Sequence, residues 1–199
     1  MADKNLRPDK KIIASLIPAG SRVLDLGCGD GTLLKTLIAE KKASGMGIEK
    51  DPEALNICLS KGLSVLQVDL NEGLSKFEDG FFDFVILNMT LQVIDRPDRL
   101  VKEMVRVGKK AIVGFPNFGL WILRFGFLLS GRMPKSRTLP YEWYDTPNIR
   151  LMTIKDFRGL CKEVNVKIEK EIFIDDDGKL IAPFWVNLRA AEGVFLLGR

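Results

Sequence analysis

The sequence predicts an α/β fold in which helices cover both faces of a mostly parallel sheet. Between residues 22 and 115, short apolar runs alternate with amphipathic helical patterns, which is typical of βαβ units. The first apolar run leads into a glycine-rich turn and then a helix, the connection with which such folds bind nucleotides. No repeat or flexible linker divides the 199 residues, so we expect a single domain over residues 1–199.

Each expected element has a local cause in the sequence. We expect strands at residues 22–26, 44–49, 64–69, 82–88, 110–115, 166–174 and 192–197. The helix boundaries are marked by Thr32, by Asp51-Pro52 with Gly62, by Pro97 with Gly108, and by the capping pair Thr153 and Asp156. The first of these helices has Leu33, Leu34, Leu37 and Ile38 on one face.

The turn after the first strand combines three glycines with two acidic residues. Gly27, Gly29 and Gly31 let the backbone adopt positive φ and approach a ligand closely, and the next helix directs free N–H groups to the same place. Their spacing is G-x-G-x-G, whereas dinucleotide-binding turns have G-x-G-x-x-G/A. Asp25 and Asp30 would repel a pyrophosphate but suit a cation. We therefore infer S-adenosylmethionine, which carries a sulfonium and an ammonium group, or its product S-adenosylhomocysteine as the cofactor.

Further polar side chains end the later strands, and the carboxyl ends of parallel strands meet at the edge of the sheet where ligands bind. Glu49 is placed to accept hydrogen bonds from ribose hydroxyls, or else it is a solvent-exposed strand end. Asp69 is placed to accept from the adenine amino group while Leu70 packs on the ring, or else it forms a turn with Asn71. Asn88 is expected to bond the amino-acid part of the cofactor or the substrate, or else to cap a loop. The predicted cofactor-binding residues are Asp25, Gly27, Cys28, Gly29, Gly31, Glu49, Lys50, Asp69, Leu70 and Asn88.

The composition excludes several classes of function. The chain has no histidine, which excludes a Ser-His-Asp triad and most catalytic zinc sites. Its three cysteines form no C-x-x-C pair, so we expect reduced thiols, no metal site, and in Cys28 a small loop residue rather than a nucleophile. Residues 118–129 are apolar but too short to span a membrane. Residues 1–5 are polar with no apolar segment behind them, so we expect no signal peptide and a cytoplasmic protein.

Residues 117–150 break the alternation, and we interpret them as an aromatic and basic insertion over the sheet. They hold a charge of +3 within a total of +4, too little to indicate nucleic-acid binding. The side chains expected to contact a substrate or a protein partner are Trp121, Arg124, Tyr141, Trp143 and Tyr144. The alternative is that Trp121, Phe125 and Leu129, at helical spacing, pack against the sheet. The candidates for a catalytic base here are Glu142, Asp145 and Tyr144.

Three segments carry a resemblance to one family. They are Asn117-Phe118-Gly119, Gly131-Arg132-Met133-Pro134 and Leu139-Pro140-Tyr141-Glu142-Trp143-Tyr144-Asp145-Thr146-Pro147-Asn148-Ile149, and the likeness begins at Leu6-Arg7-Pro8-Asp9. On these residues the chain resembles the methionine biosynthesis protein MetW family over nearly its whole length. The resemblance implies a Rossmann-like class I methyltransferase fold with a seven-stranded sheet whose last strand is antiparallel. It also implies a role beside homoserine O-acyltransferase (MetX type), as a partner that supports acylation of homoserine.

Two functional hypotheses follow. In the first, the chain is an S-adenosylmethionine-binding subunit that works with homoserine O-acyltransferase, and the cofactor is a substrate or a sensed end product. Because the chain lacks histidine and a G-x-S-x-G nucleophile elbow, the acyl-transfer chemistry would belong to the partner. In the second hypothesis, the chain is a free-standing methyltransferase acting on a small acidic molecule. A third possibility is a scaffold that binds no cofactor.

Overall fold

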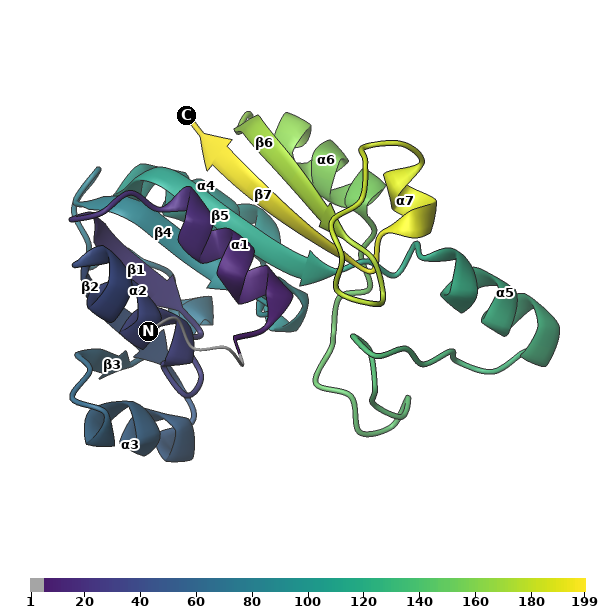
Figure 1. The fold of residues 1–199 in the computed structure, drawn as a ribbon, viewed down its shortest axis with the longest axis horizontal. Coiled ribbons are helices and arrows are strands. Elements are labelled where there is room, and N and C mark those ends of the chain that lie inside the picture. Colours follow the sequence, from purple (N-terminus) through teal and green to yellow (C-terminus); the bar gives the residue numbers. More distant parts are fainter. Residues whose placement is uncertain (1–5) are drawn as a thin grey trace.

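Strands and helices alternate along the chain, and the computed structural model describes them over residues 6–199 (Figure 1). The strands are β1 (Arg22–Leu26), β2 (Ser44–Glu49), β3 (Val65–Gln67), β4 (Phe82–Asn88), β5 (Gly108–Pro116), β6 (Lys167–Ile174) and β7 (Glu192–Gly198). The α-helices are α1 (Pro8–Leu16), α2 (Thr32–Lys41), α3 (Pro52–Ser60), α4 (Pro97–Val107), α5 (Trp121–Ser130), α6 (Ile154–Glu163) and α7 (Val186–Arg189). Two 3-10 helices, η1 (Leu70–Glu72) and η2 (Leu91–Val93), follow β3 and β4. The polar segment at residues 1–5, for which we expect no signal peptide, lies outside the described residues.

The strands form one sheet in the order β3-β2-β1-β4-β5-β7-β6. β1 pairs in parallel with both β2 and β4, so the strand order reverses between β1 and β4. β7 lies between β5 and β6 and is antiparallel to both. The prediction of a mostly parallel seven-stranded sheet with an antiparallel last strand is confirmed. A ligand is expected beyond the carboxyl ends of β1 and β4, because open α/β sheets bind ligands where the strand order reverses.

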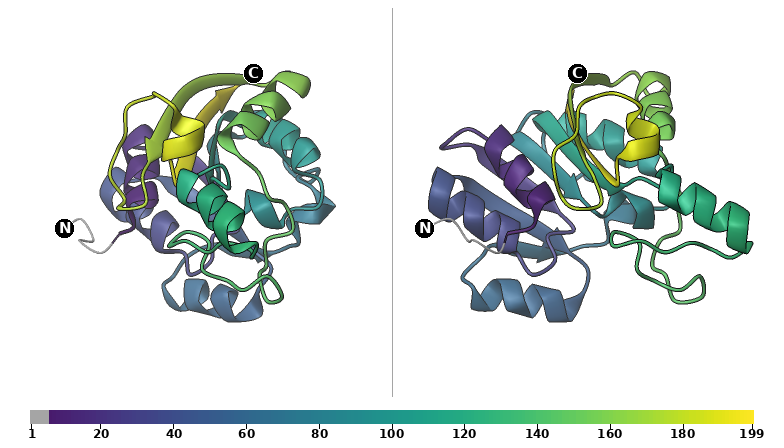
Figure 2. Two further views of the ribbon diagram at one scale, coloured as in Figure 1. Left: turned by 90° about the vertical axis from the view of Figure 1, so that its right-hand side faces the viewer. Right: turned by 45° about the vertical axis from the view of Figure 1, so that its right-hand side comes forward.

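Helices cover both faces of this sheet, as expected (Figure 2). Successive strand residues point to opposite faces, so neighbouring residues of β4 enter different cores. Ile86 packs with Ile13 of α1 and other residues of α1 and α2 on one face. Val85 packs with Met104 of α4 and Phe157 of α6 on the other. The two cores hold every strand except β3 between the helices.

Helix α1 was not among the expected elements. Pro8 occupies its first turn, where the missing N–H costs nothing, and Ile13, Ala14 and the following Ile17 are buried against the sheet. The carboxylate of Asp9, in the same first turn, is 1% exposed. Asp9 accepts a hydrogen bond from Asn88 at the end of β4, so the first turn of α1 lies at the edge of the sheet where a ligand is expected.

The insertion at residues 117–150 projects from the sheet as α5 followed by a long irregular segment (Figure 1). A small apolar cluster attaches it, formed by Leu120, Leu123, Leu139 and Ala191. The alternative that Trp121, Phe125 and Leu129 pack against the sheet is wrong, because these side chains are 49%, 52% and 83% exposed. The buried face of α5 is the face of Leu123, nearly half a turn away from Trp121 and Phe125.

None of the helices in the described part of the chain is long and apolar enough to cross a membrane. The capping box expected at Thr153 and Asp156 is present, and Gly108 ends α4 as expected. Strand β3 is shorter and β5 longer than the sequence predicts.

Candidate functional site

The glycine turn after β1 has the backbone geometry that the sequence predicts. Gly27, Gly29 and Gly31 have φ of +66°, +56° and +72°, a region that residues with a Cβ atom rarely adopt. A Cβ at Gly27 would lie 2.6 Å from Thr90 Oγ1, and one at Gly31 would lie 2.4 Å from a methyl carbon of Leu63. A Cβ at Gly29 would meet nothing within 4 Å. The first and third glycines are therefore required by packing, and the second faces open space.

Glu49, at the end of β2, is held in place by backbone amides. Its Oε2 accepts a hydrogen bond from Gly29 N at 2.8 Å, and its Oε1 accepts from Lys50 N at 2.9 Å and Asp51 N at 3.0 Å. A carboxylate offers about four lone-pair positions, so a further donor can still bond to it. This is the arrangement required for a ribose hydroxyl, with the carboxylate already oriented.

Asp69 follows β3 and forms the turn with Asn71, which was the alternative to its expected contact with adenine. Its Oδ1 accepts from Asn71 N at 2.9 Å and caps η1. No other described residue donates to its carboxylate, so Oδ2 stays available for the amino group of a base. The turn and the expected contact with adenine are therefore compatible.

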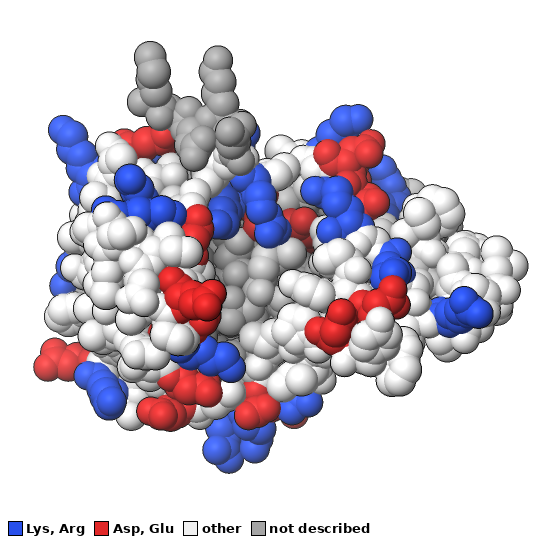
Figure 3. Space-filling view, turned by 90° about the horizontal axis from the view of Figure 1, so that it is seen from below, with Lys and Arg blue, Asp and Glu red and all other residues white. Residues whose placement is uncertain are grey.

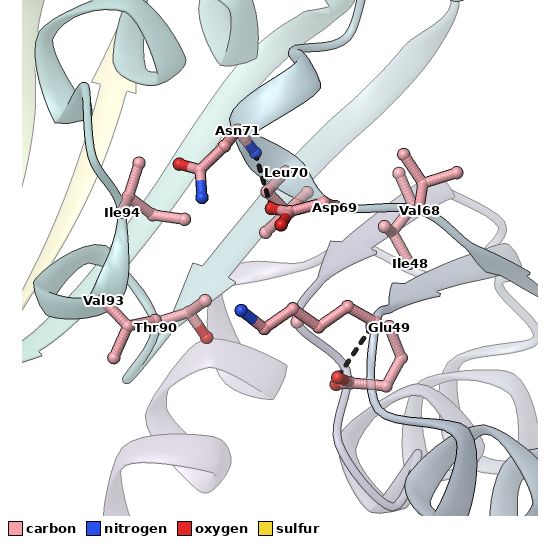
Figure 4. A pocket seen from close by; sticks show the side chains of 11 residues that line it. Ile48, Glu49, Val68, Asp69, Leu70, Asn71, Thr90, Val93 and Ile94 are labelled. Carbon is pink, nitrogen blue, oxygen red and sulfur yellow. Dashed lines mark hydrogen bonds between the residues drawn. The ribbon is translucent and has the colours of Figure 1, made fainter. Parts of the chain in front are cut away.

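These strand ends surround a cavity of about 210 Å³ (Figure 4). Five predicted cofactor-binding residues line it, namely Gly27, Glu49, Lys50, Asp69 and Leu70. Sequence reasoning missed the remaining lining residues, which are Ile48, Val68, Asn71, Thr90, Val93 and Ile94. In Figure 4, Val93 and Ile94 face Ile48 and Val68 across the cavity, which gives a flat ring two apolar walls. The cavity is smaller than the roughly 300 Å³ at the lower end of whole-ligand pockets, so it suits the nucleoside part of a larger molecule.

Asp25 lies behind the glycine turn, inside β1, and is 3% exposed. None of the described residues donates a hydrogen bond to its carboxylate. Desolvation, against the opposing charge of Lys10 and with smaller contributions from the charges of Glu49 and Asp30, raises the pKa of Asp25 to about 7. A buried carboxylate without a partner is costly. A bound cation next to it would favour its ionised form.

Asp30, on the other side of the turn, is already satisfied by the protein. Desolvation alone would raise the pKa of Asp30, but hydrogen bonds from Thr32 and Lys61 and the charge of Lys10 lower it to about 2. Lys61 Nζ lies 3.1 Å and Lys10 Nζ lies 3.8 Å from its carboxylate. The cation that we expected beside Asp30 is thus supplied by two lysines.

Cys28 is a buried loop residue, 6% exposed, whose Sγ lies 4.0 Å from Cys58 Sγ. Burial, with the nearby charge of Asp25, raises the pKa of its thiol well above the ordinary value. A thiol with a raised pKa is a poor nucleophile. This agrees with the expected role as a small loop residue.

Asn88, at the end of β4, does not line the cavity. Its Nδ2 donates to Asp9 Oδ2 at 2.7 Å, and Asp9 Oδ1 accepts from Arg7 Nε at 3.1 Å. The Oδ1 of Asn88 is buried and has no hydrogen-bond partner among residues 6–199. The Asn88 side chain therefore joins β4 to the start of α1.

The predicted contact residues of the insertion are all exposed. Tyr141, Trp143 and Tyr144 are 50%, 72% and 71% exposed. Arg124 Nε donates to Gly119 O at 2.6 Å. Among the expected bases, Glu142 pairs with Lys135 on this surface, away from the cofactor cavity.

The sheet order and the cavity together define a methyltransferase-like domain of class I. A SAM-dependent methyltransferase from Archaeoglobus fulgidus superimposes with a TM-score of 0.68 at 14% identity, covering 96% of this chain and 94% of that one. A possible histamine N-methyltransferase from Thermotoga maritima superimposes with a TM-score of 0.65 at 20% identity, covering 96% and 87%. Likeness at these identities concerns the fold.

The family is shown by the sequence comparison. The family model described as methionine biosynthesis protein MetW matches residues 7–197, and the chain belongs to this family. The bifunctional methionine biosynthesis protein MetXA/MetW of Rhodopirellula baltica is 42% identical over 92% of this chain. The chain spans 31% of the length of that relative.

Proposed function

We propose that this chain binds S-adenosylmethionine, or its demethylated product S-adenosylhomocysteine, and works as the partner subunit of a homoserine O-acyltransferase of MetX type. The adenosine would occupy the cavity between β2, β3 and η2. Glu49 would accept from the ribose and Asp69 from the adenine amino group. The acyl-transfer chemistry would belong to the partner, because this chain has no histidine.

The buried carboxylate of Asp25, which accepts no hydrogen bond from residues 6–199, is the observation that carries the cofactor assignment. Asp25 lies in β1, two residues before Gly27 of the glycine turn, and the positively charged part of such a cofactor would pass next to this turn. Placing a cation there offsets the cost of burying an ionised carboxylate. Bound S-adenosylmethionine would supply an activated methyl group on its sulfonium. The chain's contribution would be to orient that cofactor and to exclude water from it.

The partner assignment is supported by the fused name MetXA/MetW of the Rhodopirellula relative and by the exposed surface of α5. On α5, the apolar side chains of Phe125, Phe127, Leu128 and Leu129 are 52–83% exposed. Seen from below, the projecting end that carries α5 is largely uncharged (Figure 3). Contiguous exposed apolar surface marks interaction sites in soluble proteins, and aromatic side chains with arginine are common anchors at such sites.

Co-purification tests the partner assignment. A tagged homoserine O-acyltransferase from the source cell should retain this chain, and homoserine acylation should be faster in its presence. Phe125→Ala should weaken the complex about 30-fold, from the loss of about 2 kcal/mol expected for an interface anchor. Phe184→Ala, at a phenylalanine 62% exposed outside the insertion, is the matched control and should leave the complex unchanged. An acylation rate indifferent to this chain, together with methylation of a small acidic metabolite, would instead support a free-standing methyltransferase.

A further inference from the structure

A second cavity, of about 480 Å³, adjoins the cofactor cavity at Val93. Four segments that are distant in the sequence build it: the residues before α1, the turn of η2, the irregular part of the insertion, and the start of β7. They contribute Arg7, Gln92, Arg137 and Glu192. A hollow lined by polar and charged groups from four separate segments, three of them charged, differs from the ordinary solvated face of one helix or loop.

Two guanidinium groups lie at this cavity. Arg7 Nη2 and Arg137 Nη2 are each 4.0 Å from Glu192 Oε1. At that distance neither guanidinium makes a close hydrogen bond to Glu192. Both arginine side chains are about half exposed, 52% and 50%. Arg7 Nε donates to Asp9 Oδ1 and Arg137 Nε donates to Asp176 O, but no terminal N–H of either guanidinium makes a close hydrogen bond to a described residue. Paired guanidinium groups favour a carboxylate.

Two buried residues at the same cavity have acceptor atoms that receive no close hydrogen bond from residues 6–199. Gln92 is 6% exposed, and its Nε2 donates to Met89 O at 2.7 Å. The Oε1 of Gln92 is buried and has no hydrogen-bond partner in the described part of the chain. Glu192 is 4% exposed, and no described residue donates a close hydrogen bond to its carboxylate. A group with several N–H donors, such as an ammonium, would satisfy both acceptors.

The segments that carry the family resemblance meet at this cavity. Arg7 belongs to Leu6-Arg7-Pro8-Asp9, and Pro140, Tyr141, Pro147 and Asn148 of the run at residues 139–149 line the opposite wall. The end of this run is hydrogen-bonded to η2, because Ile149 N and Arg150 N both donate to Gln92 O at 3.0 Å. The glycine turn, by contrast, serves the first cavity. The residues that carry the family resemblance therefore surround the second cavity.

We infer that the second cavity binds a free small α-amino acid, whose carboxylate pairs with Arg7 and Arg137 and whose ammonium group lies against Gln92 Oε1 and Glu192. The inference rests on the proposed function only in assigning the first cavity to the cofactor. Since the cavities adjoin, the amino acid would lie beside the end of the cofactor. The bound amino acid would then contact the insertion, which forms the outer wall of the second cavity.

Calorimetry with matched probes tests this inference. A series of straight-chain L-amino acids from L-alanine to L-norleucine is titrated into the full chain, with and without saturating S-adenosylhomocysteine. At least one member should bind, and its deaminated acid and its amide should each bind about tenfold more weakly or worse, since each lacks one charge-assisted contact. Arg137→Met should weaken the amino acid about tenfold and leave S-adenosylhomocysteine unchanged. Arg132→Met, at an exposed arginine of the same insertion, is the control and should change neither.

Two results would overturn the inference. If no amino acid of the series binds up to millimolar concentrations while S-adenosylhomocysteine does, the second cavity has another role and the proposed function stands. If Arg137→Met weakens S-adenosylhomocysteine but not 5′-methylthioadenosine, which lacks the amino-acid tail, the cavity holds the cofactor's own tail. Failure of the proposed function is distinct, because S-adenosylhomocysteine would then not bind the unmodified chain at all.

Discussion

Gly29→Ala separates the stability of the fold from the binding of the cofactor. Gly29 has φ +56°, and a Cβ there meets no atom within 4 Å. The substitution therefore costs only the strain of a left-handed residue, about 1 kcal/mol. In a domain of this size such a loss lowers Tm by about 2–4 °C. Gly20→Ala is the matched control, because Gly20 has φ +76°, also meets nothing within 4 Å, and lies between α1 and β1.

The two substitutions should differ in cofactor affinity. At position 29 the added methyl group enters the space in front of the turn, where we place the cofactor. Overlap of one methyl group with a packed ligand costs about 1–3 kcal/mol, which corresponds to a loss of about tenfold or more in affinity. Calorimetric titration with S-adenosylhomocysteine and thermal melts of both variants measure the two effects. Equal affinity in Gly29→Ala and Gly20→Ala would refute the position assigned to the cofactor.

Three further predictions follow from burial and capping. Desolvation raises the pKa of Asp25 to about 7. As the pH rises from about 4 through 7, ionisation of this buried carboxylate therefore lowers the free energy of unfolding, by on the order of 4 kcal/mol. Asp25→Asn should therefore melt higher than the unmodified chain at about pH 8, with the difference disappearing near pH 4; an equal difference at both pH values would contradict this. Thr153→Ala removes the capping box of α6 and should lower the unfolding free energy by about 1 kcal/mol, measured in urea. The buried thiols of Cys28, Cys58 and Cys161 should resist iodoacetamide in the folded chain and react after unfolding, as mass spectrometry would show.

The fold was predictable where a local sequence pattern determines the bounds of a strand or helix. The bounds of β4 and α4 follow from an apolar run and from Pro97 and Gly108, and the structure agrees with them. Helix α1 was not predicted, although Ile13 and Ile17 recur at helical spacing, because the alternation of strands and helices begins only at the first strand. The antiparallel direction of β7 was expected only from the family resemblance. Its place between β5 and β6 was not predicted, since no local pattern specifies which neighbour a strand chooses.

The candidate site was predictable to the extent that parallel strands end at one edge. Glu49 and Asp69 line the first cavity for that reason. Arg7, Gln92 and Glu192 could not be found in this way, because the second cavity forms only when α1, η2 and β7 meet. Their chemistry depends on burial and on neighbours from distant segments, which spacing along the chain does not encode.

A calorimetric titration of the unmodified chain with S-adenosylmethionine at neutral pH, repeated in two buffers of different ionisation enthalpy, tests the central assignment most directly. We predict saturable one-to-one binding with release of a fraction of a proton, because the bound cation favours the ionised carboxylate of Asp25. Absence of saturable heat, or binding with no proton released, would contradict the account.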